Sequence, residues 1–168
     1  RKSIRKAQKL GITVKKEYNP DIFWELTRLT YEKQNKRVPF QKEYLFNLME
    51  MLIHNNLGEM WIAETSDGNT VSSAFNVHDS HLAHGWTAAN DPKFLGTGGV
   101  SLLLFEIFTD LQKRGFHRFN LMSGNIAAFS KFSSGFNPRL VPYFSVENTK
   151  GLGKVLPYLD TTVRYISE

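Results

Sequence analysis

Three short apolar runs joined by tight turns restrict the fold of this chain more than any other feature. The runs are Trp61–Ala63, Val71–Val77 and Leu82–Ala89, and the turns between them are Ser66-Asp67-Gly68-Asn69 and Asp79-Ser80. Short runs bounded by Gly, Asn, Asp and Ser are typical of antiparallel strands joined by hairpins. The centre of the chain therefore predicts a meander of three antiparallel strands.

Helical patterns precede and follow this meander. Apolar side chains at helical spacing predict one helix between Pro20 and Lys36 and another from Tyr44 to Leu52. A longer amphipathic helix is expected from Val100 to Leu111. A strand at Arg118–Met122, a short helical stretch ending at Phe132 and a last strand at Leu140–Val146 complete the order. This order predicts an α+β (α/β) class in which helices flank a sheet.

The composition is that of an ordinary globular chain of 168 residues, 41% of them hydrophobic, which can bury a core without metal or cross-link. It contains no Cys, and this excludes thiolate chemistry. Apolar runs such as Val100–Phe105 fall far short of the ~20 residues of a membrane helix, so we expect no membrane span. Residue 1 is Arg, and no signal-peptide pattern follows it. We therefore expect a cytoplasmic protein whose chain is a fragment of a longer one.

The net charge of +5 is concentrated at the amino terminus, where residues 1–16 carry seven Lys and Arg side chains and no acid. Such a segment attracts phosphates, although a basic helical face is also typical of a solvated surface. Its apolar stripe, made by Ile4, Ala7 and Leu10, is thin. We expect residues 1–18 to form a basic helix and a lead-in strand, and residues 19–168 to form a single domain. We also expect the basic helix to be peripheral, so that deleting residues 1–9 costs little stability.

The segment Pro92-Lys93-Phe94-Leu95-Gly96-Thr97-Gly98-Gly99 joins the last meander strand to the long helix. A glycine-rich loop at a helix start presents unpaired N–H groups and the positive end of the helix dipole, which suits a diphosphate. The same glycines could instead serve only a tight strand-to-helix connection. A P-loop is excluded because no Lys follows Gly99, and a dinucleotide fingerprint is excluded because position 120 is Asn. If the loop binds phosphates, we expect a bulky residue at Gly98 to weaken binding without unfolding the chain.

The order of motifs resembles the GNAT acyltransferases over nearly the whole chain. Residues 92–99 resemble the GNAT loop P-x-Y-R-G-x-G-I-G, with Leu95 in place of the usual Arg or Gln and Val100 in place of the last Gly or Ala. A shift of two residues would make Lys93 the basic position instead. Arg114-Gly115, the following strand, and then Asn125, Ala128 and Phe132 are similar to the GNAT pattern Arg-Gly, strand, N-x-x-A-x-x-x-Y. The resemblance implies a GNAT-like fold with a central, mostly antiparallel mixed sheet flanked by helices.

This resemblance also implies an activity. The implied reaction transfers an acyl group from acyl coenzyme A, as co-substrate and without a metal, to the amine of a small molecule or a peptide. The donor-binding residues that the resemblance implies are Leu95, Gly96, Thr97, Gly98, Gly99, Val100 and Asn125.

Two further stretches are similar to the FemAB-like branch of these enzymes, and in particular to its carboxy-terminal GNAT-like half. Residues 1–11 resemble R-x-x-I-R-K-A-x-K-x-G, and residues 132–136 with Val141-Pro142-Tyr143 resemble F-K-x-G-F-G and V-P-Y. Residues 119–124 lack the two acids of the family pattern F-D-F-E-G-S, and Ser133 replaces a Lys. The implied alternatives are an aminoacyl-tRNA donor with a cell-wall peptide acceptor, residues 1–16 then touching the tRNA, or a non-catalytic half-domain. An upstream GNAT-like domain would be the partner.

Acyl transfer to an amine needs a base for the ammonium proton, N–H groups for the oxyanion and an acid for the leaving thiolate. The resemblance places that acid at Phe132, which has no hydroxyl and by its spacing is expected in the core. The candidate catalytic residues are Tyr143, which could instead be an aromatic at a sheet edge, and Glu64, which could be a solvated strand-end charge. The acid or base could also be a histidine or an ordered water molecule, or the thiolate could leave without an acid. His78, His81 and His84 cluster in sequence; we interpret them as surface or substrate-facing residues and expect no metal.

Overall fold

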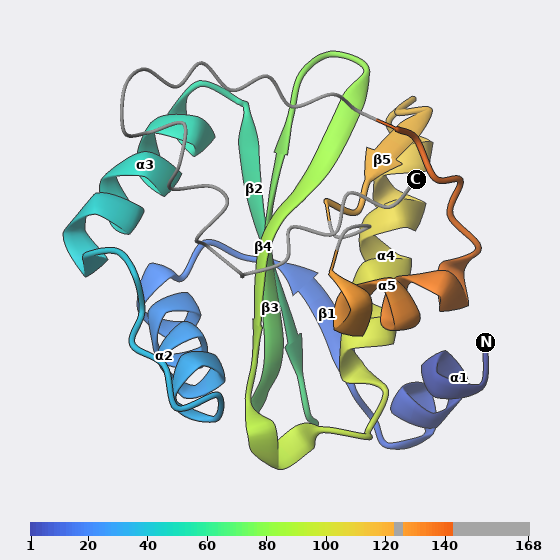
Figure 1. Cartoon of the computed structure of the whole chain (residues 1–168). Helices are drawn as coiled ribbons and strands as arrows, with labels where there is room; N and C mark the ends of the chain where they lie inside the picture. Colours follow the sequence, from blue (N-terminus) through green and yellow to red (C-terminus); the bar gives the residue numbers. More distant parts are fainter. Residues whose placement is uncertain (123–125, 143–168) are drawn as a thin grey trace, which may run out of the picture. The chain divides into compact units, whose positions relative to one another are not determined.

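A mixed sheet forms the framework of the computed structural model, which describes residues 1–122 and 126–142. The strands are β1 (Thr13–Lys16), β2 (Gly58–Glu64), β3 (Thr70–His78), β4 (Leu82–Asn90) and β5 (Arg118–Asn120). They lie in the order β1-β2-β3-β4-β5 (Figure 1). Neighbouring strands are antiparallel from β1 to β4, and β5 is parallel to β4. The predicted meander and the mostly antiparallel mixed sheet are confirmed.

Two pairs of helices cover the two faces of this sheet (Figure 1). One face carries α2 (Pro20–Glu32) and α3 (Lys42–His54), and the other carries α1 (Lys2–Lys9) and α4 (Gly99–Lys113). Alternation along β2 divides the core, because successive side chains of a strand point to opposite faces. Met60 and Ile62 belong to the cluster with α2 and α3, whereas Trp61 and Ala63 belong to the cluster with α1 and α4.

The local sequence explains where the helices begin. The Asn19 side chain accepts a hydrogen bond from the Ile22 N–H at 3.2 Å, and Pro20 occupies the first turn of α2, where its missing N–H costs nothing. The helix predicted between residues 20 and 36 ends at Glu32. The helix predicted from Tyr44 to Leu52 corresponds to α3, which is less than one turn longer at each end.

The chain divides into two units, residues 1–120 and residues 121–168. In the second unit, the described residues form α5 (Ala127–Ser133) and a 3-10 turn, η2 (Ser134–Phe136). The predicted short helix ending near Phe132 is confirmed. Phe132 was expected in the core but is exposed and packs against the Phe136 ring, with centroids 5.8 Å apart. Residues 140–142 have no regular structure, and the rest of the strand expected at 140–146 lies outside the described residues.

The amino-terminal helix is part of the core, so the prediction that it is peripheral is wrong. Ala7 of α1 is fully buried, and Ile12 after the helix is also buried, in the same cluster as Leu102 and Leu103 of α4. Ile4 also packs against this cluster, whereas Leu10 is exposed. Two apolar residues of α1 are sufficient because the small Ala7 side chain lets α1 approach α4 closely. The upstream domain before residue 1 stays a prediction.

The turn between β3 and β4 provides a prediction for solution measurement. The Asp79 carboxylate accepts hydrogen bonds from the backbone N–H groups of His81 (2.6 Å) and Leu82 (2.7 Å). These bonds, that of His81 first, lower the pKa of Asp79 below the ordinary aspartate value. The carboxylate therefore stabilises the fold at pH values above that ordinary value, and the contribution is lost as the pH falls through the lowered pKa.

NMR titration of the Asp79 side-chain carbon should show this lowered pKa. The Asp79→Asn variant keeps an acceptor oxygen but loses the charge, so its stability should lose this part of the pH dependence. A folded-state pKa of Asp79 at or above that of the unfolded chain would contradict the prediction.

Candidate active site

An opening in the sheet lies beside β4. Strands β4 and β5 pair at three positions, the last of which joins His84 to Asn120, where β5 ends. Strand β4 continues to Asn90. Within the described part of the chain, the edge of β4 from Gly85 onward therefore has no strand beside it on this side, and Ala88 is exposed. We call residues 85–89 the open edge; among residues 1–122 and 126–142, no strand pairs with its backbone N–H and C=O groups on this side.

The far end of the open edge is closed by a side chain of α2. The hydroxyl of Thr30 donates to the Asn90 carbonyl at 3.2 Å and accepts from the Asn90 N–H at 3.1 Å. The open edge thus lies between two fixed points, the β4–β5 pair at His84 and the α2 contact at Asn90.

A β-bulge shapes the open edge. Asn76 of β3 pairs with Gly85, but the preceding residue, Phe75, pairs with Thr87, so that Trp86 is one residue too many on β4. A bulge leaves the extra residue out of the ladder and is frequent next to active sites. The Trp86 ring packs edge-on against Phe75, with centroids 5.6 Å apart, and this contact fixes the bulge against the core.

The glycine loop connects the end of β4 to α4. A 3-10 turn, η1 (Pro92–Phe94), begins it. The Thr97 hydroxyl donates to the Phe94 carbonyl at 2.7 Å and accepts from the Gly99 N–H at 3.3 Å. Gly98, with a left-handed φ of 88°, is the residue before α4. The first N–H groups of α4, which have no acceptor within a helix, therefore face the end of the loop and can bind an anion.

Close packing explains two of the glycines. A Cβ at Gly98 would collide with the backbone carbonyl of Ser3 in α1, and a Cβ at Gly99 would collide with the Val71 side chain. The expectation that a bulky residue at position 98 leaves folding intact is therefore wrong, because α1 occupies the space. At Gly96, no atom of the described residues lies within 4 Å of the Cβ position. Gly96 is thus the loop glycine with free space beside it.

Helix α1 adds positive charge to this loop. The Lys6 amine donates a hydrogen bond of 2.7 Å to the Gly96 carbonyl. This bond uses one of the three N–H groups of the ammonium and leaves two for other acceptors.

The structure brings together most of the donor-binding residues expected from the sequence. Leu95 is exposed, Thr97 and Val100 are half-buried, and the loop glycines lie beside them. Glu64 is not near the open edge: β3 lies between its strand, β2, and β4. Its carboxylate forms an ion pair of 3.0 Å with Lys15. Asn125 and Tyr143 lie outside the described residues, and the catalytic roles of Glu64 and Tyr143 stay predictions.

The three clustered histidines have different surroundings. His78 packs edge-on against the Phe116 ring at 5.3 Å, and His81 contacts the Ser80 hydroxyl. His84 is half-buried, and its Nδ1 lies 3.4 Å from the Asn120 side-chain nitrogen. Across residues 1–122 and 126–142, no three His, Cys, Asp or Glu side chains gather as metal ligands would.

Sequence reasoning missed two buried polar residues. Glu59 of β2 is 6% exposed, and its carboxylate accepts from Arg114 (2.8 Å), Lys16 (2.9 Å) and the Trp61 indole (3.1 Å). Asn76, its neighbour on β3, is fully buried, and its amide has no hydrogen-bond partner among the described residues. Asn76 could have been singled out as a polar residue within the run at 71–77. Glu59 gave no such signal, because its partners lie on β1 and α4.

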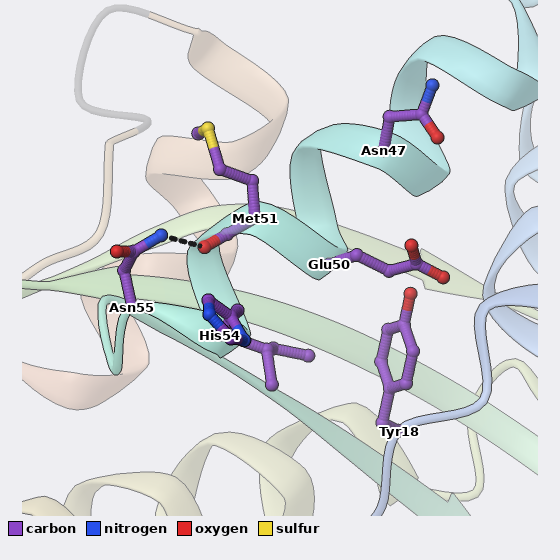
Figure 2. Close-up of a pocket in the computed structure, with 7 residues that line it drawn as sticks. Tyr18, Asn47, Glu50, Met51, His54 and Asn55 are labelled. Carbon is purple, nitrogen blue, oxygen red and sulfur yellow. Dashed lines mark hydrogen bonds between the residues drawn. The ribbon is translucent and has the colours of Figure 1, made fainter.

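A depression separate from the open edge lies beside the end of α3. It has a volume of about 520 Å³ and is lined by Tyr18 and by six residues near the end of α3 (Figure 2). Burial and the nearby Glu50 charge raise the pKa of Tyr18. Asn47, Glu50, Met51 and His54 are all exposed, so this is a solvated helix face rather than an enclosed pocket.

Comparison with known proteins defines the class. Residues 1–129 match the family model described as acetyltransferase (GNAT) domain. The chain belongs to this family. No curated protein matches the sequence. Within the described residues, no helix is long and apolar enough to cross a membrane.

Solved structures share the fold. FemX is 12% identical with a TM-score of 0.65, over 71% of this chain and 46% of FemX, so this chain spans less than half of that protein. A predicted acetyltransferase with acetyl-CoA from Clostridium acetobutylicum is 12% identical, with a TM-score of 0.63, over 82% of this chain and 96% of that protein. An aminoglycoside acetyltransferase from an uncultured soil metagenomic sample, in complex with sisomicin, is 16% identical. Its TM-score is 0.56, over 83% of this chain and 97% of that protein. The expected GNAT-like fold is confirmed.

Proposed function

We propose that this chain is an N-acyltransferase that moves an acyl group from acyl coenzyme A to the amine of a small molecule or peptide. The observation that carries the proposal is the position of the glycine loop at the end of the open edge of β4. One donor molecule could then bind with its phosphates at the first turn of α4 and with its extended arm along β4. Residues 95–100 and Asn125 would hold the donor.

The proposed chemistry uses the bulge as well as the loop. An amine attacks the thioester carbonyl, and the carbonyl oxygen becomes negatively charged before the C–S bond breaks. In this proposal, backbone N–H groups of the open edge donate to that oxygen, and the bulge at Trp86, where the ladder is irregular, supports it. Tyr143 is proposed as the proton donor to the leaving thiolate, in keeping with the sequence prediction.

Donor binding tests this proposal directly. Calorimetric titration with acetyl-CoA should show one site, and Lys6→Gln should weaken binding roughly three- to tenfold, because a charge next to the loop is removed. Lys9→Gln is the matched control, since it removes the same charge from α1 without a contact to the loop among the described residues. Absence of binding by the wild-type chain would contradict the proposed function. Equal effects of the two variants would contradict the role of Lys6.

A second candidate function follows from the likeness to FemX and from the basic α1 helix. In this alternative the donor is an aminoacyl-tRNA, the acceptor is a cell-wall peptide precursor, and an upstream GNAT-like domain completes the protein. Titration with tRNA separates the two proposals, because only the alternative requires binding of tRNA in preference to acetyl-CoA. Binding of neither donor would favour a non-catalytic half-domain.

A further inference from the structure

His84 lies at the point where the sheet opens. It is the last residue of β4 that pairs with β5, and the bulge begins at the next residue, Gly85. Among residues 82–90 of β4, His84 is the one residue with an ionisable side chain, and its imidazole has a nitrogen lone pair that can take up a proton. The opening therefore has one ionisable side chain on β4, at the end where the pairing with β5 stops.

The His84 side chain lies on the face of the sheet opposite to α4, the helix that follows the glycine loop. His84 pairs with Val77 of β3, and Val77 packs with the cluster under α2 and α3. Directly paired residues share a face of the sheet. The glycine loop leads into α4, which covers the other face. A donor held at α4 would thus reach through the opening toward the face on which His84 lies.

The distances along β4 agree with this arrangement. The strand from His84 to Asn90 spans about 20 Å at the ordinary rise of a β-strand. The extended pantetheine arm of coenzyme A is of comparable length, so phosphates bound at the loop would place the thioester near the bulge and His84.

Asn120 can fix the imidazole for this role. Its amide lies beside Nδ1 of His84, at 3.4 Å between the nitrogens. A carboxamide presents either its oxygen or its nitrogen after a half-turn. With the oxygen toward His84, it accepts the Nδ1 proton, and the lone pair then lies on Nε2.

We infer that His84 is the general base of the proposed acyl transfer, with Asn120 as its positioning residue. The acceptor ammonium gives one proton to Nε2 of His84, and the freed amine nitrogen attacks the thioester carbon. The C–N bond forms as the carbonyl electron pair moves to oxygen; its return breaks the C–S bond. The departing sulfur takes its proton from the donor named in the proposed function, the second proton of the nitrogen restores that donor, and His84 returns its proton to water. This inference rests on the proposed function.

The test measures acetyl transfer from acetyl-CoA to a set of primary amines, sisomicin and a lysine peptide among them, using the amine that the wild-type chain acetylates fastest. His84→Ala should lower kcat by roughly 10²- to 10⁴-fold. The affinity for acetyl-CoA should stay within about twofold, because the phosphate site is distant along β4. Added imidazole should restore part of the rate, which a purely structural role would not allow.

Two further variants keep the test decisive. His84→Gln preserves the size of the side chain and a contact to Asn120 but cannot act as the base, so it should be as slow as His84→Ala and fold normally. His81→Ala, in the same hairpin, should keep the wild-type rate. Wild-type kcat in either His84 variant, or a loss of rate without imidazole rescue and with a lower melting temperature, would overturn the inference. A wild-type chain that neither binds acetyl-CoA nor acetylates any amine would instead overturn the proposed function, and the role of His84 with it.

Discussion

Replacement of Gly98 by leucine is expected to lower the free energy of unfolding by about 3 kcal/mol. Gly98 has a left-handed φ of 88°, which costs other residues roughly 1–2 kcal/mol. The new side chain would also meet the Ser3 backbone, and a backbone carbonyl cannot move aside as a flexible side chain does. Overpacking of this kind typically costs 1–3 kcal/mol. Undocking of α1 would then expose Ala7 and the adjoining core.

Gly96→Leu is the matched control for this prediction. Gly96 has a similar φ of 84°, but within residues 1–122 and 126–142 nothing lies within 4 Å of its Cβ position. Urea unfolding should therefore show only the conformational cost of the left-handed φ at position 96, roughly 1–2 kcal/mol. In titrations with acetyl-CoA, the same variant should bind more weakly, because its side chain fills the free space beside the loop. Equal stabilities of the two variants would refute the packing argument.

Periodicity was sufficient to predict most of the sheet and its helices. The hairpin turns at 66–69 and 79–80 and the 3.6-residue pattern of α4 are local features, so they can be recognised without the rest of the chain. The glycine loop was found for the same reason. Its residues are consecutive, and the backbone conformation that they adopt follows from their composition.

Contacts between distant segments could not be predicted in this way. The docking of α1 depends on Ala7, whose small side chain carries little apolar signal in a sequence but allows close helix contact. The bulge at Trp86 and the end of the β4–β5 pairing at His84 depend on partner strands. The apolar pattern of β4 alone does not specify them.

The two glutamates of β2 illustrate the same limit. Glu59 and Glu64 lie at the two ends of one strand, and only Glu64 was singled out as a candidate. In the structure, Glu64 meets Lys15 of the neighbouring strand, whereas Glu59 meets Arg114 at the end of α4. The difference arises from α4, more than 50 residues further along the chain.

Glu59→Ala is expected to lower the free energy of unfolding by about 3 kcal/mol, since removal of one partner from a buried ion pair typically costs 3–5 kcal/mol. The carboxylate is almost fully buried, and its loss leaves Lys16 and Arg114 with the carboxylate of Asp110, which pairs with both of them. Those two side chains are 42% and 34% exposed, so water can partly hydrate them, and this keeps the expected loss near the lower limit.

Glu64→Ala provides the control, because its ion pair with the exposed Lys15 is of the surface kind and should change the free energy of unfolding far less than Glu59→Ala does. Urea unfolding of both variants, together with a double-mutant cycle between Glu59 and Arg114, measures the difference. A coupling energy near zero between these two residues would show that the carboxylate does not hold α4 to β2. A large coupling would mean that Glu59 anchors the last turn of α4. The glycine loop precedes the first turn of this helix and packs against α1, so both ends of α4 would then fix the position of the loop.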